Sequence, residues 1–383
     1  MSLSVRGKTK YVVDPIVGKL TKDSTFSKDD NRILFLDNFQ ENKIEIQGIK
    51  AIIANNNDLN NLPKPIEDIP IAYGVNTIDN FDEGDIVVIH PGGTVRTLFQ
   101  INSSHNFLFA TDRCNSNCLM CSQPPKDKED IPYLYNINNQ VIELIPKNTE
   151  YIGITGGEPT LMGEYFYKLL IKILTEIPNA KIHVLTNGRV FAWNSVVKKI
   201  NEFYEPRITF AIPFYSDYYK HHDYIVQARD AYSQTILGIH NLGRYDMQIE
   251  IRIVLHKQSI SRLTKLAKFI YNYMPYVSHV AFMGLEYTGY TKHNDSILYI
   301  DPINYINELD NSINFLVENQ INVSIYNLQL CLLPKNLWKY CRKSISDWKQ
   351  TNLDECKKCS KSDECCGVFE TSKKYTSNIK AFS

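Results

Sequence analysis

The sequence of 383 residues is 43% hydrophobic, which is enough to bury a sizeable core and excludes a largely disordered chain. Lysine plus arginine and aspartate plus glutamate number 42 each, so no overall charge favours nucleic acid or an anionic membrane. No early apolar run resembles a signal peptide, and no stretch approaches the length of a membrane span. We therefore expect a cytoplasmic protein that binds no membrane and whose partners do not include nucleic acid.

The first 100 residues predict a small, mostly β N-terminal domain. Short apolar runs between polar turns predict strands at 32–36, 43–46, 50–53, 85–89 and 94–99. Pro91, Gly92 and Gly93 separate the last two runs and predict a hairpin. No catalytic pattern stands out in this domain, so its hypothesised role is to dock a partner chain at a sheet edge.

Residues 101–300 alternate between two kinds of hydrophobic pattern. The predicted strands are 105–110, 151–155, 181–186, 207–213, 248–255 and 279–283, and the predicted helices are 136–145, 164–177, 192–203, 231–242 and 259–273. Buried strands alternating with helices are typical of an α/β fold. Six units are too few for a closed eight-stranded barrel, so we expect a partial (β/α)6 TIM-like barrel. Residues 301–383 hold six of the nine cysteines and form a cysteine-rich C-terminal extension.

The first cysteine cluster, Cys114, Cys118 and Cys121, directly follows the first strand of the predicted barrel. In a reducing compartment, clustered cysteines indicate metal sites rather than disulfides. Thiolates suit zinc or iron–sulfur clusters, and three of them do not complete a tetrahedral zinc site. The cluster is therefore either a zinc knuckle with a distant fourth ligand or a four-iron site with one iron open to a small molecule.

Other candidate residues follow the carboxyl ends of later strands, where β/α folds carry their chemistry. Gly156 and Gly157 would let the backbone approach a ligand closely, and Glu158 would offer a carboxylate to an ammonium group. The alternative is a strand-to-helix turn with a solvated acid. Ser216 would bond a ribose hydroxyl or cap a helix. Arg252 would pair with a ligand carboxylate or with a structural acid such as Glu250.

Together, the Cys114–Cys118–Cys121 spacing and the later Gly156-Gly157-Glu158 loop resemble the radical S-adenosylmethionine (SAM) superfamily, over about residues 105–290. The resemblance implies an oxidoreductase whose three thiolates hold a [4Fe–4S] cluster, with SAM chelating the open iron. One electron would cleave SAM to methionine and a 5′-deoxyadenosyl radical. The resemblance also implies a set of SAM-binding residues: Glu158 for the ammonium, Arg252 for the carboxylate, Ser216 for the ribose, and Met283 with Gly284 and Leu285 for adenine. Met120 stands where the superfamily often has an aromatic residue, and its thioether can still pack against adenine.

The C-terminal cysteines resemble the auxiliary-cluster extensions called SPASM or twitch domains, although only in part. The predicted metal ligands are Cys331, Cys341, Cys356, Cys359 and Cys365, and Cys366 follows directly. Six thiols suffice for one auxiliary [4Fe–4S] cluster and fall short of two. A structural zinc ribbon is the alternative.

Within the superfamily, residues 110–125 and the short cysteine-rich tail resemble the maturase of His-Xaa-Ser repeat systems, type C. This resemblance implies a peptide or small protein substrate, a second radical SAM partner protein and an external electron donor. Two other functions compete with it. One is radical SAM chemistry on RNA or a cofactor precursor, which the neutral charge disfavours. The other is a zinc-bound interaction protein without catalysis.

Overall fold

The computed structural model describes residues 4–25, 28–36, 47–55, 68–75, 81–343, 349–372 and 374–382. The strand predicted at 43–46 lies outside the described residues. The chain forms two compact units. The first comprises Met1–Leu108, Pro132–Ile152 and Leu169–Ala180, and the second comprises Phe109–Ile131, Gly153–Lys168 and Lys181–Ser383.

The N-terminal unit is built on an eight-stranded sheet with the order β1-β8-β7-β3-β4-β5-β6-β2. Its strands are β1 (Ser4–Arg6), β2 (Lys8–Lys10), β3 (Ile16–Thr21), β4 (Arg32–Leu36), β5 (Ile49–Ala54), β6 (Ile71–Tyr73), β7 (Ile86–Ile89) and β8 (Thr94–Phe99). The predicted hairpin is confirmed, because β7 and β8 pair antiparallel. Gly93 takes the positive φ of 82° that the turn requires, which a glycine adopts without strain.

Residues 4–10 connect the two ends of this sheet, because β1 pairs with β8 while β2 pairs with β6. Gly7 lies between the two short strands, and its N–H donates to Gly93 O at 2.8 Å. A Cβ at Gly7 would lie 2.4 Å from Tyr73 O, so only glycine fits this passage. The chain's own first strands thus occupy the outer edges of β8 and β6, where the docking hypothesis would place a partner strand.

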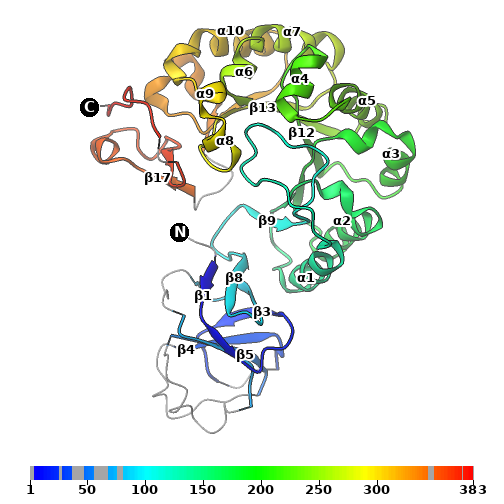
Figure 1. Ribbon diagram of the computed structural model, residues 1–383, viewed down its shortest axis with the longest axis vertical. Coiled ribbons are helices and arrows are strands. Elements are labelled where there is room, and N and C mark those ends of the chain that lie inside the picture. Colours follow the sequence, from blue (N-terminus) through cyan, green and yellow to red (C-terminus); the bar gives the residue numbers. More distant parts are fainter. Residues whose placement is uncertain are drawn as a thin grey trace. The chain divides into compact units, whose positions relative to one another are not determined.

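The second sheet also has eight strands, in the order β16-β15-β14-β13-β12-β11-β10-β9. Figure 1 labels β9, β12 and β13 of this sheet. Its strands are β9 (Asn106–Phe109), β10 (Tyr151–Thr155), β11 (Lys181–Leu185), β12 (Ile208–Pro213), β13 (Gln248–Leu255), β14 (His279–Gly284), β15 (Val323–Tyr326) and β16 (Cys341–Arg342). Consecutive strands from β11 to β16 pair in parallel, which confirms the expected α/β partial barrel. The sheet is longer than the six predicted strands because β15 and β16, from beyond residue 300, continue it.

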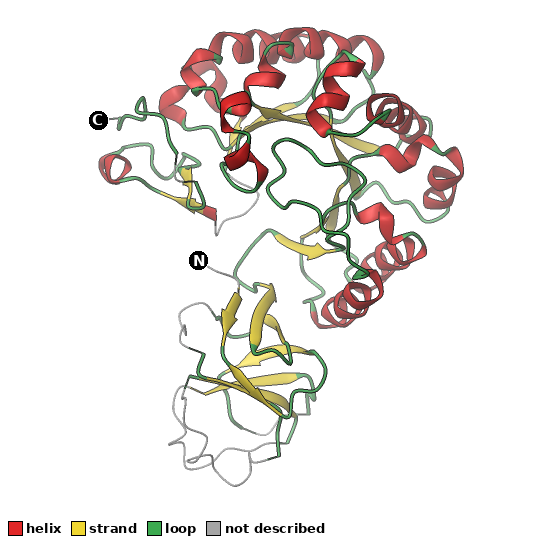
Figure 2. Cartoon of the chain, in the orientation of Figure 1, coloured by secondary structure: helices red, strands yellow, loops and turns green. Residues whose placement is uncertain are grey.

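Helices follow the strands along the chain, and within the second unit most of them lie on the outer side of the curved sheet (Figure 2). The longer ones are α1 (Ile131–Leu144), α2 (Glu164–Glu176), α3 (Asn194–Asn201), α4 (Tyr219–Val226), α5 (Ala231–Gly243), α7 (Leu263–Tyr273) and α10 (Ile306–Glu318). The helix predicted at 259–273 is divided, since α6 (Lys257–Ile260) ends before α7 begins. Among the described residues, no helix is both long enough and apolar enough to cross a membrane.

Candidate functional site

The cysteine triad lies in the loop between β9 and α1, and two distant segments fix its backbone. Asn117 N–H and Leu119 N–H donate to the last carbonyls of α4, at 3.0 and 2.9 Å. On the other side, Tyr290 N–H donates to Cys121 O at 2.9 Å. A Cβ at Gly289 would lie 2.3 Å from that same oxygen, so the glycine lets the two segments meet. The loop is therefore held at a defined position before any ligand binds.

The three thiols share one partly buried space. Burial, with the Glu158 charge adding to it, raises the pKa of Cys114 to about 11. Burial also raises the pKa of Cys118, and the nearby Cys121 and Cys114 thiols raise it further. Bound iron would reverse this preference by stabilising the thiolates. Among the described residues, no three Cys, His, Asp or Glu side chains converge closely enough to hold one metal ion. In a four-iron cluster each thiolate binds a different iron, so three thiols surrounding one space fit that group.

Gly156 and Gly157 bring the second loop against the chain that leads to the triad. Gly157 N–H donates to Thr111 O and Glu158 N–H donates to Arg113 O, both at 2.7 Å. A Cβ at Gly157 would lie 2.1 Å from Arg113 O, and Gly156 has a φ of 154°. The sequence predicted that these glycines allow a ligand to approach the backbone. In the structure they allow the approach of another stretch of backbone.

Glu158 is fully buried and ties two loops together. Its Oε1 accepts hydrogen bonds from Thr160 N–H at 3.1 Å, Thr160 Oγ1 at 2.7 Å and Thr186 Oγ1 at 2.7 Å. Its Oε2 accepts one from Asn187 N–H at 2.6 Å. Burial raises the pKa of Glu158, and these donors oppose that shift. The alternative of a solvated acid is therefore wrong, while the contact with a SAM ammonium group stays a prediction.

Arg189 is a residue of the site that sequence reasoning missed. Its Nη1 donates to Asn115 O and, at 3.3 Å, to Ser116 Oγ, inside the triad loop. Its Nε donates to Gln234 Oε1 at 2.7 Å, which anchors the guanidinium to α5. The available signal was a basic residue directly after Asn187-Gly188, in the loop that follows the predicted strand at 181–186.

The other predicted SAM-binding residues lie in the same unit as the triad. Ser216 is fully buried and its Oγ accepts from Tyr218 N–H at 3.1 Å. Tyr218 is itself the N-cap of α4, which has no side-chain cap hydrogen bond, so the capping alternative is wrong. Arg252 Nε lies 3.5 Å from Glu250 Oε1, the pairing weighed as its structural alternative. Met120 is 7% exposed and belongs to a core cluster with Tyr215. Met283 lies on β14. Their contacts with SAM stay predictions.

A buried polar network around Glu250, inside the sheet, was also not predicted from the sequence. His279 Nδ1 lies 2.8 Å from Glu250 Oε2, and His183 Nε2 lies 3.3 Å from Oε1. Burial would raise the pKa of Glu250, but the hydrogen bonds of His183 and His279 and the Arg252 charge hold it well below its ordinary value. The network fixes Arg252 beside an ionised carboxylate.

Four of the C-terminal cysteines line one small pocket. They are Cys331, Cys356, Cys359 and Cys365. Cys341, also predicted as a ligand, is not among the residues that line it, and its thiol lies 3.6 Å from Leu337 O. A hydrogen bond from Cys366 lowers the pKa of Cys365 to about 6, although burial opposes it. The pocket thus gathers four thiols from a stretch of 35 residues, as a cluster with four cysteine ligands requires.

Comparison with known proteins identifies the class of the central domain. Residues 108–270 match the family model described as "Radical SAM superfamily". The matched segment contains the cysteine triad, the Gly-Gly-Glu loop, Ser216 and Arg252, so the chain contains a radical SAM domain. No curated protein matches the sequence.

The solved structures with a similar fold come from proteins that are described by different activities. "Native anSMEcpe with bound AdoMet" is 19% identical with a TM-score of 0.44, over 57% of this chain and 62% of that one. A radical SAM methyltransferase from Sphaerobacter thermophilus is 12% identical with a TM-score of 0.41, over 64% and 74%. Coproporphyrinogen III oxidase (HemN) from Escherichia coli is 13% identical with a TM-score of 0.45, over 56% and 52%. Such distant likenesses do not define an activity.

Proposed function

We propose that this chain is a radical SAM enzyme that cleaves SAM reductively and modifies a peptide or small protein. The observation that carries the proposal is the match of residues 108–270 to the superfamily model, over a segment in which the cysteine loop and the Gly-Gly-Glu loop are hydrogen-bonded together. The resemblance of the tail and of residues 110–125 to His-Xaa-Ser maturases supports a peptide as the substrate.

In this proposal Cys114, Cys118 and Cys121 hold a [4Fe–4S] cluster with one iron open to SAM. When bound, the cluster and SAM supply a one-electron cleavage that yields methionine and a 5′-deoxyadenosyl radical. This chain's own contribution is a loop of fixed geometry. Arg189 holds its start through Asn115 and Ser116, and Tyr290 holds its end at Cys121. Because the thiols are placed in advance, the cluster and SAM are oriented without further folding of the site.

We propose the same SAM-binding residues that the sequence indicated. Glu158 would accept from the ammonium, Arg252 would pair with the carboxylate, Ser216 would bond the ribose, and Met120 and Met283 would contact adenine. The placement of Arg252 supports its role. Burial raises the pKa of Tyr215, and Cys118, Arg252 and Cys121 also act on it, which supports a position of the guanidinium near the triad.

We further propose an auxiliary [4Fe–4S] cluster in the C-terminal pocket, with zinc as the alternative. Cys331, Cys356, Cys359 and Cys365 would be its ligands, since they line the pocket together. Cys341, expected from the sequence to be a fifth ligand, would not be needed for a four-thiolate site. A second radical SAM protein and an external electron donor are the proposed partners.

The test is anaerobic reconstitution with iron and sulfide, followed by reduction with dithionite in the presence of SAM. We expect 5′-deoxyadenosine by chromatography, and none from Cys118→Ala. Reconstituted protein that carries iron and yields no 5′-deoxyadenosine would refute the enzyme. A colourless protein that retains zinc alone after oxygen-free purification would instead support the interaction protein.

A further inference from the structure

Tyr215 is a buried tyrosine to which the proposed function assigns no chemical role. It follows β12, which ends at Pro213 and pairs in parallel with β13. The residue between them, Phe214, donates its N–H to Arg252 O at 3.0 Å, which continues the pairing with β13. Tyr215 therefore lies at the carboxyl edge of the sheet, where the proposed SAM contacts also lie.

The ring of Tyr215 is held against the loop that carries the triad. It packs in one apolar group with Leu119 of that loop, and Cys118 packs against the same group. The centroid of the tyrosine ring lies 6.1 Å from that of His222, on α4, and 5.9 Å from that of His256, the N-cap of α6. Neighbours on several sides thus fix the position of the ring.

The hydroxyl of Tyr215 has no partner among the described residues. The residue is 5% exposed, and its hydrogen bond to His222 Nδ1, at 3.3 Å, comes from its backbone N–H and not from its O–H. Nε2 of the neighbouring His256 also lacks a partner, but it is fully enclosed, whereas the tyrosine hydroxyl keeps accessible surface that a bound group can reach. An unpaired O–H on a buried side chain is uncommon and calls for an acceptor on such a group.

The groups that act on Tyr215 indicate what its hydroxyl faces. Burial raises its pKa, Cys118 and Cys121 raise it further, and Arg252 lowers it. Together with the packing against the cysteine loop, this supports a position of the hydroxyl near the triad. The acceptor that the hydroxyl lacks would then belong to a group bound by the thiols or by Arg252.

Two anionic acceptors are proposed to bind in this space: the sulfur atoms of the iron–sulfur cluster and the carboxylate of SAM. The SAM carboxylate already has Arg252 as its proposed partner. The cluster sulfurs need donors, and the chain supplies one at the start of the loop, since Ser116 N–H donates to Cys114 Sγ at 3.4 Å. Tyr215 would supply a second donor on the side of Cys118.

We propose that the Tyr215 O–H donates a hydrogen bond to a sulfur of the triad's iron–sulfur cluster, at or beside Cys118, and so raises the reduction potential of that cluster. Reduction by one electron makes the cluster more negative, and a fixed donor at a sulfur atom stabilises the added charge. The tyrosine keeps its proton throughout. The inference rests on the proposed function for the presence of the cluster, and it names a residue that sets how readily the cluster is reduced.

The experiment is a redox titration of the reconstituted full-length chain without SAM, followed by electron paramagnetic resonance. The signal of the triad's cluster is the one that Cys114→Ala removes. Tyr215→Phe keeps the ring and loses the donor, so at a fixed potential we expect a ratio of reduced to oxidised cluster that is about tenfold lower. For a one-electron couple this ratio corresponds to a midpoint potential lowered by about 59 mV.

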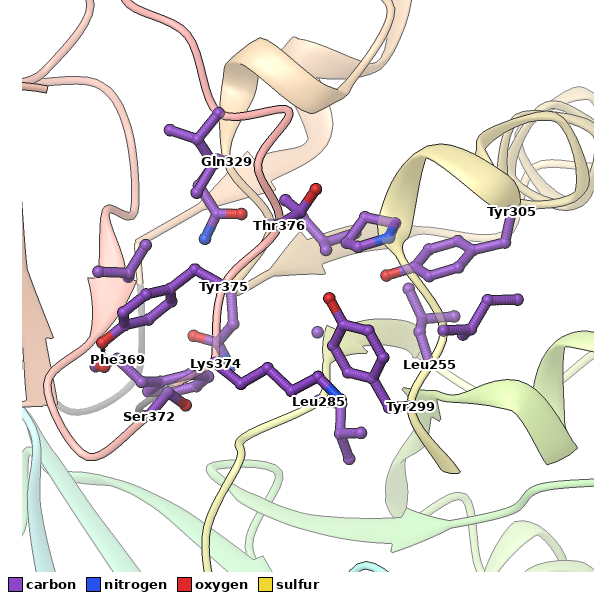
Figure 3. A pocket seen from close by; sticks show the side chains of 17 residues that line it. Leu255, Leu285, Tyr299, Tyr305, Gln329, Phe369, Ser372, Lys374, Tyr375 and Thr376 are labelled. Carbon is purple, nitrogen blue, oxygen red and sulfur yellow. Dashed lines mark hydrogen bonds between the residues drawn. The ribbon is translucent and has the colours of Figure 1, made fainter. Parts of the chain in front are cut away.

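Tyr305→Phe is the matched control, because it also removes a buried tyrosine hydroxyl. Tyr305 is 2% exposed and lines, with Tyr299 and Lys374, a pocket that none of the triad cysteines lines (Figure 3). This variant should leave the midpoint potential of the triad's cluster unchanged.

A second measurement detects the hydrogen bond itself. Electron–nuclear double resonance of the reduced cluster, compared in H₂O and D₂O, should show an exchangeable proton in the wild-type chain and in Tyr305→Phe that Tyr215→Phe lacks. A residue that acted only through packing would not produce this difference.

An unchanged midpoint potential in Tyr215→Phe, or the same exchangeable proton in that variant, would overturn the proposal. Loss of the triad's iron in Tyr215→Phe would also overturn it, since the hydroxyl would then hold the site together. If the midpoint stayed constant and the affinity for SAM fell, the hydroxyl would serve the SAM carboxylate and the proposal would be wrong. If Cys114→Ala removed no signal, the cluster and the proposed function would themselves be refuted, so the two failures are distinguishable.

Discussion

The two cysteine sites differ in how the chain builds them. The triad lies within eight residues of one loop, and α4, Arg189 and the segment around Tyr290 fix it from several sides. The tail site draws four thiols from 35 residues, a stretch whose described residues form short 3-10 helices and the two-residue strands β16 and β17 (Gln350–Thr351). A site within one loop can be recognised from spacing, whereas a site assembled from separate turns depends on the fold around it.

The largest expected effect is on SAM cleavage, which should depend on the triad and not on the tail site. Replacing Cys114 by Ala should remove about four iron atoms per chain and abolish formation of 5′-deoxyadenosine, because the open iron is lost. Cys356→Ala should also remove about four iron atoms while 5′-deoxyadenosine still forms. Iron analysis and chromatography check both outcomes. Loss of SAM cleavage in both variants would show that the sites are not independent.

The next effect identifies the ligands of the tail site. Cys331→Ala should lose the auxiliary iron, because Cys331 lines the pocket with three other cysteines. Cys341→Ala should retain it, since Cys341 is not part of that lining. Iron content and electron paramagnetic resonance of the reduced proteins distinguish the two. Equal loss in both would restore the five-ligand assignment made from the sequence.

A smaller effect tests how tightly the triad loop is held. In Gly157→Ala the new methyl would meet Arg113 O at 2.1 Å, so backbone must shift, at a cost of about 3 kcal/mol in the free energy of unfolding. Gly163→Ala is the matched control. Its φ of 57° costs about 1 kcal/mol, and no atom lies within 4 Å of the new methyl. Urea unfolding measures both, and similar losses would contradict the close approach.

The smallest predicted effect concerns Glu250, within the sheet that carries the triad, and depends on pH. Burial would raise its pKa, but its hydrogen bonds to His183 and His279 and the Arg252 charge hold the folded-state pKa below 4.5, the ordinary value expected for the unfolded chain. Protonation therefore favours unfolding, so the stability that Glu250 contributes is present above about pH 4.5 and is lost as pH falls. Glu250→Gln should cost about 2 kcal/mol at pH 7 and progressively less below pH 4.5.

The control for Glu250 is Glu143→Gln, which removes a carboxylate that is 55% exposed and paired with Lys172. Exposed ion pairs contribute little, so we expect a change below about 0.5 kcal/mol with no marked pH dependence. Urea midpoints between pH 3.5 and 7 compare the two variants. A loss for Glu250→Gln that stays constant over this range would show that the carboxylate is not ionised in the folded chain.

Several features of the candidate site were predictable because they are local in the chain. Cys114, Cys118 and Cys121 are spaced so closely that one loop must gather them, and Gly156-Gly157-Glu158 follows a strand whose hydrophobic pattern is clear. The partner of Glu158 was not predictable. Its carboxylate turns inward to Thr186 and Asn187, and that contact exists only because β10 and β11 are neighbours in the sheet.

The sequence by itself determined the α/β class, most strand positions and the cysteine triad, because hydrophobic periodicity and short spacings are properties of the chain alone. The tertiary structure decided which four tail thiols share a pocket, that residues 4–10 connect the two ends of the N-terminal sheet, and that β15 and β16 extend the second sheet. It also decided that Arg189 holds the cysteine loop. The physical reason is that these features depend on pairings between residues far apart in sequence, which local patterns do not specify.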